Sequence, residues 1–247
     1  MTARGACLAV LLTVSALQLA SAAGEASPPA SVAHKRASFG QQQVSSEVSG
    51  LAAWILHSAD NQGMPFMIVD KVNAQVLVLD KDGQLKGVAP ALLGLAPGDD
   101  STPGIGERKL SNILAHERTT PAGRFVASLD RNLHGVEILW IDYATSISLH
   151  KVVKGTPREQ RAQRLSSATA ADNRISYGCI NVPVSFFDKV VSPAFTGTNG
   201  IVYILPETRT AREIFGSYDV DEAAQALAPA TPAPAPAAAS RGQRAVQ

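Results

Sequence analysis

The sequence predicts a single mainly β domain with a few flanking helices, and three features favour that fold class. Between residues 64 and 217, short apolar segments with strand-like patterns recur and are separated by turn residues such as Gly, Asn and Asp. Helical spacing appears in only a few segments. Helices do not alternate with strands, so a β-sandwich or a partly closed barrel is favoured over a doubly wound parallel sheet.

The first residues are typical of a signal peptide rather than of a folded element. Arg4 precedes an apolar and small-residue run from Ala6 to Ala20, which is too short and too rich in alanine for a membrane span. Small residues at Ala20 and Ala22 favour cleavage after residue 22, so residues 1–22 are the predicted signal peptide. We therefore expect an exported protein with no membrane span after cleavage.

Composition divides the rest of the chain into four predicted parts. Residues 23–43 contain few large apolar side chains and are expected to form a flexible linker. Residues 44–63 are expected to form a helix that packs on the domain, and residues 64–217 are long enough for one domain with its own core. Residues 218–247, rich in alanine and proline, are expected to form a disordered tail. The predicted helix has apolar residues at helical spacing: Val44, Val48, Leu51, Ile55 and Leu56.

Strands and two further helices are expected within the domain. Helices are predicted at 157–165 and at 183–191, where Pro183 is suited to a first helical position. The Gly- and Pro-rich segment 97–106 is interpreted as a loop, because it lacks the Lys-Ser/Thr pair of a phosphate-binding P-loop. Strands are predicted at 66–69, 75–79, 84–88, 124–129, 136–142, 147–152 and 201–205.

Charge and cysteine content limit the possible partners. The chain has 22 Lys and Arg against 21 Asp and Glu, so the mature protein without Arg4 is near neutral and offers no basic field for nucleic acid. One of its 2 cysteines, Cys7, lies in the predicted signal peptide. Cys179 is then alone and cannot form an internal disulfide, so it is a buried thiol, an intermolecular partner or a nucleophile.

A histidine and this cysteine are the candidate catalytic pair. Alternation along the strand 147–152 places Ser148 and His150 on one face. A free thiol, with a pKa of about 8.5, is only slightly ionised at neutral pH, and an adjacent imidazole raises the reactive fraction. Gly178 permits a tight turn before Cys179, and the backbone N–H groups of Tyr177, Gly178 and Cys179 are candidates for binding an oxyanion.

Other histidines fit a catalytic pattern less well. His116 is followed by Glu117 but lacks the second histidine of the zinc-protease motif, and we predict no metal site. His134 is kept as an alternative base, although it is farther from Cys179 in the sequence. A papain-like peptidase requires the cysteine near the mature N-terminus and the histidine downstream, which is the reverse of the order here.

The segment Ser176-Tyr177-Gly178-Cys179-Ile180-Asn181, preceded by a strand histidine, resembles the motif of the L,D-transpeptidase catalytic-domain family. Residues 119–125, Thr-Thr-Pro-Ala-Gly-Arg-Phe, are similar to the Thr-Pro-x-Gly-x-Phe block of that family. The hairpin at 68–79 is similar to its first hairpin, and the resemblance spans about 66–206. The chain departs from the family pattern at Tyr177, where a second histidine is usual, and in the longer separation of His150 from Cys179.

The resemblance implies a mixed β-sandwich and a cysteine acyltransferase that acts on peptidoglycan stem peptides in the periplasm. Cys179 would attack the carbonyl of the third stem residue and expel the terminal D-alanine, with His150 as base and Tyr177 and Gly178 at the oxyanion. An amine acceptor gives a cross-link, whereas water gives carboxypeptidase activity. The resemblance implies no cofactor and implies carbapenems as inhibitors, and we expect a monomer. The alternative is an inactive wall-binding relative, because Tyr177 replaces the usual histidine.

Substrate-binding residues are expected around the same segment. Residues 154–173 carry several arginines and are interpreted as a basic lid, or alternatively as a solvated surface helix. Arg164 and Arg174 are predicted to bind free carboxylates of the stem peptide, because a guanidinium pairs with a carboxylate through two parallel hydrogen bonds. Ser176 and Asn181, which flank the cysteine, are also placed among the substrate-binding residues.

Overall fold

The computed structural model describes residues 35–227. The predicted signal peptide at 1–22, most of the predicted linker and residues 228–247 of the predicted tail lie outside the described residues.

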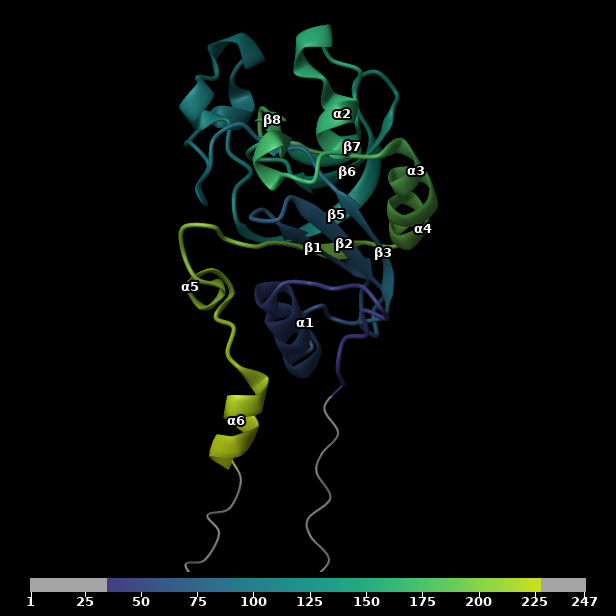
Figure 1. Ribbon diagram of the computed structural model, residues 1–247, viewed down its shortest axis with the longest axis vertical. Helices are drawn as coiled ribbons and strands as arrows, with labels where there is room; N and C mark the ends of the chain where they lie inside the picture. Colours follow the sequence, from purple (N-terminus) through teal and green to yellow (C-terminus); the bar gives the residue numbers. More distant parts are fainter. Residues whose placement is uncertain (1–34, 228–247) are drawn as a thin grey trace, which may run out of the picture. The chain divides into compact units, whose positions relative to one another are not determined.

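The centre of the fold is an eight-stranded sheet with the order β3-β2-β1-β10-β5-β6-β7-β9 (Figure 1). The pairs β1–β10 and β7–β9 are parallel, and the other neighbours are antiparallel. The sheet is therefore mixed, as predicted. Its strands are β1 Phe66–Asp70, β2 Gln75–Leu79, β3 Leu85–Pro90, β5 Gly123–Arg131, β6 Glu137–Asp142, β7 Ile147–Lys151, β9 Ile180–Val182 and β10 Gly200–Ile204.

Strand β5 joins two halves of this sheet. Residues 123–127 pair with β10, whereas residues 128–131 pair with β6. The two halves pack against one another, because Leu139 of β6 and Leu149 of β7 lie in the same buried cluster as Met67 of β1 and Val76 of β2. Burying one continuous core between the halves gives the sandwich that the sequence predicts.

Helix α1, Ser46–Ser58, covers the other face of the β1–β2–β10 half (Figure 1). It lies within the predicted range 44–63. Ser45 caps it by accepting a hydrogen bond from the backbone N–H of Val48, and Ala59 ends it in the left-handed conformation. Successive β1 residues face opposite cores: Phe66 packs with α1, whereas Met67 packs between the halves.

The remaining helices are short. The predicted helix at 183–191 is present as α3 Val184–Phe186, a π-helical turn Phe187–Val191 and α4 Ser192–Phe195. The predicted helix at 157–165 is a 3₁₀ turn Pro157–Glu159 followed by α2 Arg161–Leu165. Near the C-terminal end lie α5 Ala211–Phe215 and α6 Val220–Leu227. No helix between residues 35 and 227 is long and apolar enough to cross a bilayer.

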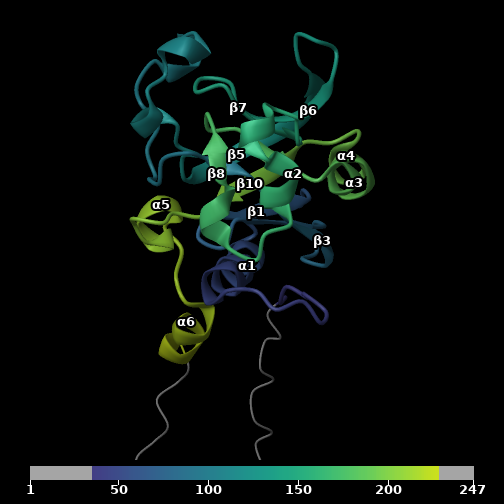
Figure 2. The same cartoon turned by 45° about the horizontal axis from the view of Figure 1, so that its top comes forward.

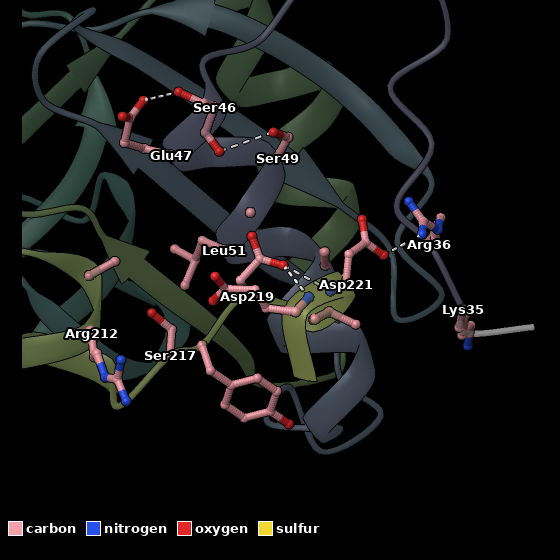
Figure 3. A pocket seen from close by; sticks show the side chains of 16 residues that line it. Lys35, Arg36, Ser46, Glu47, Ser49, Leu51, Arg212, Ser217, Asp219 and Asp221 are labelled. Carbon is pink, nitrogen blue, oxygen red and sulfur yellow. Dashed lines mark hydrogen bonds and ion pairs between the residues drawn. The ribbon is translucent and has the colours of Figure 1, made fainter. Parts of the chain in front are cut away.

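Two predicted flexible segments are partly ordered. Within the predicted linker, Ser38 pairs with Gln84, just before β3: its N–H donates to the Gly83 carbonyl, and its carbonyl accepts from the N–H of Leu85. The first part of the predicted tail forms α6, because Val220 is buried in the cluster around α1. A groove of about 670 Å³ lies between α1 and this segment, and two of its lining residues, Arg36 and Asp221, form an ion pair (Figure 3).

Three short strands were not predicted, and they lie near the cysteine. β4, Leu93–Gly94, pairs in parallel with β8, Arg174–Ser176, and β9 follows Cys179. Segments of two or three residues carry no measurable alternation, so a sequence pattern does not identify them. The loop predicted at 97–106 continues into three 3₁₀ turns, Ile105–Glu107, Leu110–Asn112 and Ala115–Glu117.

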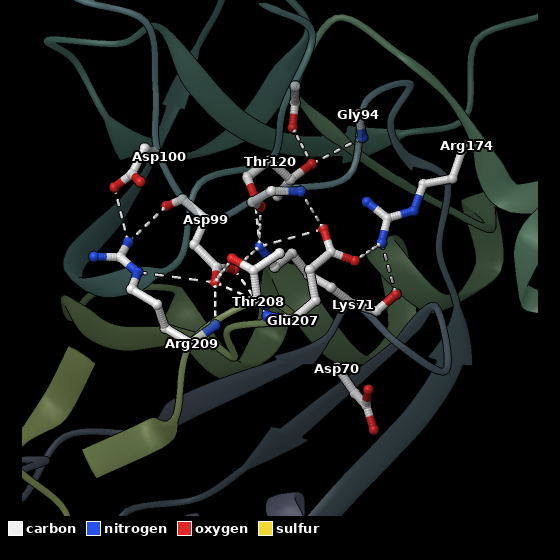
Figure 4. A network of polar contacts seen from close by, with 12 residues as sticks. Asp70, Lys71, Gly94, Asp99, Asp100, Thr120, Arg174, Glu207, Thr208 and Arg209 are labelled. Atoms are coloured by element: carbon white, nitrogen blue, oxygen red, sulfur yellow. Dashed lines mark hydrogen bonds and ion pairs between the residues drawn. The ribbon is translucent and has the colours of Figure 1, made fainter. Parts of the chain in front are cut away.

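A buried charged network fixes the loops around the sheet (Figure 4). The ammonium of Lys71 is fully buried and lies 2.8 Å from the Asp99 carboxylate, which is also fully buried. It also donates to the carbonyls of Gly98 at 2.5 Å and Thr120 at 3.1 Å. Asp99 in turn accepts from the backbone N–H of Glu207 at 2.8 Å. One cation thus joins the end of β1 to the segment that leads into β5.

Candidate active site

Sheet topology brings the candidate base and nucleophile together. β7 and β9 are parallel neighbours, and His150 is in register with Asn181, two residues after Cys179. The turn between β8 and β9 carries Cys179 at its end. His150 and Cys179 are therefore joined by hydrogen-bonded strands although 28 residues separate them in the sequence.

The thiol of Cys179 faces β7 and opens onto a cavity. Its Sγ lies 3.6 Å from the Ser148 hydroxyl and 3.5 Å from the Ser146 carbonyl oxygen. The side chain is partly exposed, and it lines a cavity of about 220 Å³. A sulfur sealed in the core would be inert, so this placement is compatible with chemistry.

The hydrogen bonds of His150 define which ring nitrogen faces the thiol. Nδ1 lies 2.8 Å from the Lys151 carbonyl, which can only accept, so Nδ1 carries the proton. Nε2 is then the nitrogen available to Cys179. Burial opposes protonation of the imidazole, but Cys179 and the Lys151 carbonyl outweigh it, so the pKa of His150 is raised.

The same contact favours the thiolate. Partial burial of the thiol opposes its ionisation, but His150 and then Ser148 outweigh that effect, so the pKa of Cys179 is lowered. A raised pKa on the imidazole and a lowered pKa on the thiol together favour a thiolate–imidazolium pair.

Gly178 has a structural reason to be glycine. Its φ is +133°, and a Cβ at this position would meet the Thr119 carbonyl oxygen at 2.9 Å and the Ile147 side chain at 2.8 Å. The Thr120 hydroxyl donates to the Gly178 carbonyl at 2.7 Å while it accepts from the N–H of Gly94 at 2.9 Å. Because Thr120 is fully buried, it holds the turn firmly against β4.

Ser176 and Asn181, predicted to bind substrate, instead hold the turn from within. Ser176 Oγ donates to the Cys179 carbonyl at 2.6 Å and accepts from the N–H of Gly178 at 3.0 Å. The Asn181 amide donates to the same carbonyl at 3.2 Å and accepts from Arg161 at 2.9 Å. Both side chains are buried, so neither is available to a ligand.

The oxyanion prediction changes in one respect. The N–H of Gly178 is occupied by Ser176 and is not available to a ligand. Among the described residues, the backbone N–H groups of Tyr177 and Cys179 have no hydrogen-bond acceptor. Those two groups are the remaining candidates for binding an oxyanion.

Arg164 and Arg174, which were predicted to bind carboxylates of the substrate, have acceptors within the protein. Arg164 donates to the Glu159 carbonyl at 2.7 Å and to the Asp172 carbonyl at 2.5 Å, so it closes the segment 154–173 on itself. Arg174 pairs with Glu207 in the Lys71 network (Figure 4). Backbone and carboxylate acceptors inside the protein thus take part of the donors that were assigned to substrate, and Arg174 Nη1 is buried without a hydrogen-bond partner among the described residues.

The cavity beside Cys179 is walled mainly by residues 101–119, not by 154–173. Tyr177 lines it too, and the Arg118 guanidinium lies 3.9 Å from the centre of the Tyr177 ring. Strand alternation places Ser148 beside His150, but no sequence pattern marked it as a site residue. Arg108, another lining residue, had no sequence signal. The lining residues are Ser101, Ile105, Gly106, Arg108, Leu110, Ile113, Thr119, Thr145, Ser146, Ile147, Tyr177 and Cys179.

The other candidate groups lie elsewhere. His134, the alternative base, is exposed in the turn between β5 and β6, where its N–H donates to the Asn132 side chain. In the part of the chain from 35 to 227, no group of three or more His, Cys, Asp and Glu side chains is arranged to hold a metal ion.

The Ser148 hydroxyl gives a testable pH effect. Ser148→Ala removes a donor that stabilises the thiolate, so the pKa of Cys179 should rise and the rate of thiol alkylation at pH 7 should fall roughly threefold to tenfold. Above the thiol pKa the two rates should converge, because both thiols are then ionised. Iodoacetamide rates measured from pH 5 to 10 check this. Superimposable profiles would contradict a role for Ser148, and Ser111→Ala, at an exposed serine, is the matched control.

Comparison with known proteins gives matches among solved structures only. No protein-family model and no curated protein matches this sequence. The catalytic domain of the L,D-transpeptidase from E. faecium is 17% identical, and the match covers 57% of this chain and 96% of that chain with a TM-score of 0.35.

Two further matches involve longer proteins. The L,D-transpeptidase from Xylanimonas cellulosilytica DSM 15894 is 14% identical over 57% of this chain and 60% of that chain, with a TM-score of 0.35. L,D-transpeptidase 3 from Mycobacterium tuberculosis, solved with a faropenem-derived adduct, is 15% identical over 58% and 60%, with a TM-score of 0.36. This chain thus spans less than two thirds of those two structures. Each of these three solved structures is an L,D-transpeptidase.

Proposed function

We propose that this protein is a peptidoglycan L,D-transpeptidase that uses Cys179 as its nucleophile and His150 as its base. The observation that carries the proposal is a partly exposed thiol that opens onto a cavity and is paired with an imidazole of fixed tautomer. The resemblance of residues 176–181 to the family motif supplies the substrate class, a tetrapeptide stem. We also propose that the protein is exported to the periplasm and is a monomer.

In the first step, the Cys179 thiolate attacks the carbonyl carbon of the third stem residue and forms a C–S bond. The negative charge passes to the carbonyl oxygen, where the N–H groups of Tyr177 and Cys179 stabilise it. The C–N bond to the terminal D-alanine then breaks, and the His150 imidazolium donates its Nε2 proton to the leaving amine. The product is a thioester, and His150 is left neutral.

In the second step, an amine from another stem attacks the thioester carbonyl. His150 Nε2 accepts a proton from that amine as the C–S bond breaks, so the thiolate–imidazolium pair is restored. Water in place of the amine releases a tripeptide stem, which is the carboxypeptidase outcome. Tyr177 supplies its backbone N–H as histidine would, and its ring is held by Arg118.

The test is incubation of the purified protein with disaccharide tetrapeptide, followed by mass spectrometry. The expected result is loss of D-alanine, with a cross-linked dimer or a tripeptide product, and abolition of both by Cys179→Ala. A carbapenem should also form a covalent adduct on Cys179. Binding of the tetrapeptide without any product would overturn the proposal in favour of an inactive wall-binding protein.

A further inference from the structure

The cavity that holds Cys179 has an uneven distribution of charge. Of the described residues that line it, Arg108 alone has a formally charged side chain, and no acidic residue lines it. Ile105, Leu110 and Ile113 contribute apolar surface. A cation beside apolar walls is screened less than a cation in open water, so it attracts an anion more strongly.

Arg108 is held in place by a fixed partner. Its Nη1 donates to both carboxylate oxygens of Glu117, at 2.9 and 3.0 Å. Glu117 is nearly buried and also accepts from the N–H of Leu114 at 3.0 Å. That hydrogen bond, together with Arg108, lowers the pKa of Glu117, so the carboxylate remains charged and anchors the guanidinium.

Donors of Arg108 remain available after this pairing. Nη2 reaches only the Pro103 carbonyl, at a long 3.5 Å, and Nε has no acceptor among residues 35–227. The side chain is 32% exposed, so solvent or a ligand can reach it. A guanidinium has five N–H donors, and the edge formed by Nε and Nη2 is suited to bind both oxygens of a carboxylate.

The other arginines near the site have their charges paired or their donors occupied. Arg161 pairs with Glu159 at 2.6 Å and donates to Asn181 at 2.9 Å. Arg164 and Arg174 are held by the groups described above. Arg118 donates to the Ile113 carbonyl and lies over the Tyr177 ring. None of these four lines the cavity.

We propose that Arg108 is a specificity-determining residue that binds a carboxylate of the acyl-donor substrate in the cavity shared with Cys179. Identification of that substrate as a stem peptide rests on the proposed function, whereas the preference for an anion rests on the cavity alone. The segment 101–119 is then the substrate-recognition element, in place of the predicted lid at 154–173.

The experiment compares two alkylating agents that differ in charge. Iodoacetate and iodoacetamide transfer similar groups to the thiolate, but only iodoacetate carries a carboxylate. The ratio of their rate constants at Cys179 is measured in the native protein at low salt. The same ratio in urea gives the reference for an unfolded chain.

The native ratio should exceed the urea reference, and Arg108→Gln should lower it about tenfold while the iodoacetamide rate changes less than twofold. Arg108→Lys should retain part of the preference, and added salt should weaken it in the wild-type protein. Arg158→Gln is the matched control, because Arg158 is exposed and does not line the cavity, and it should leave the ratio unchanged. With tetrapeptide as substrate, Arg108→Gln should raise KM more than it lowers kcat.

Three outcomes overturn the inference: a native ratio no greater than the urea reference, an equal loss in Arg158→Gln, or no native reaction with iodoacetamide. If Arg108→Gln does not fold, the ratio in the wild-type protein and its dependence on salt still show whether the cavity prefers an anion. A preference for iodoacetate without turnover of the tetrapeptide would reject the proposed function and retain the anion site. Turnover of the tetrapeptide without a preference for iodoacetate would reject the anion site and retain the proposed function.

Discussion

His150→Gln is expected to lower the rate of Cys179 acylation at pH 7 by a factor of about 100 to 10,000. Glutamine retains a polar side chain of similar reach but neither accepts a proton nor carries a positive charge. The thiol therefore loses the partner that lowers its pKa, and the leaving group loses its proton donor. The measurement is the rate of carbapenem adduct formation on Cys179 by mass spectrometry.

The pH dependence and a second histidine separate this effect from a general loss of structure. In His150→Gln the thiol pKa rises, so the acylation rate should climb steadily with pH as the thiol ionises without help. His134→Gln is the matched control, because His134 is exposed in the turn between β5 and β6 and does not line the cavity that holds Cys179. A variant of His150 with wild-type rate, or an equal loss in His134→Gln, would reject His150 as the base.

Lys71→Met is expected to lower the free energy of unfolding by about 3 to 5 kcal/mol. Methionine fills a similar volume but leaves the fully buried Asp99 carboxylate with only the more distant Arg209 guanidinium, 3.9 Å away, and Glu207 loses a charge 3.7 Å away. The carbonyls of Gly98 and Thr120 also lose a donor. Urea unfolding followed by fluorescence gives the free energy directly.

A surface lysine provides the control for this effect. Lys86 pairs with Asp80 at 2.8 Å, but its side chain is 49% exposed, so Lys86→Met should cost less than about 1 kcal/mol. The double variant Lys71→Met with Asp99→Asn should recover part of the loss, because it removes the buried negative charge that Lys71 no longer offsets. A loss below about 1 kcal/mol in Lys71→Met would mean that the network contributes little.

Lys71 also bears on the site through Thr120. The Thr120 carbonyl accepts from Lys71, and its hydroxyl donates to Gly178, the residue before the nucleophile. A destabilised network should therefore slow acylation of Cys179 even where the variant remains folded. This link joins the buried charges to the turn through one fully buried side chain.

Local patterns in the sequence determined most of the sheet and helix α1. Runs such as 75–79 and 201–205 have strand periodicity, and 44–56 has helical periodicity, so each segment specifies its own conformation and buried face. The same alternation placed Ser148 and His150 on one face, and the single cysteine of the predicted mature chain marked Cys179. These inferences needed no knowledge of distant contacts.

Tertiary structure alone decided which polar groups are free. Arg164, Arg174, Ser176 and Asn181 are suited to bind a ligand by residue type, but each finds acceptors or donors within the fold. Arg108 remains available because its partner Glu117 occupies only one side of the guanidinium. The residue type determines which groups a side chain is able to bind, whereas long-range packing determines which of its donors and acceptors are already paired within the protein.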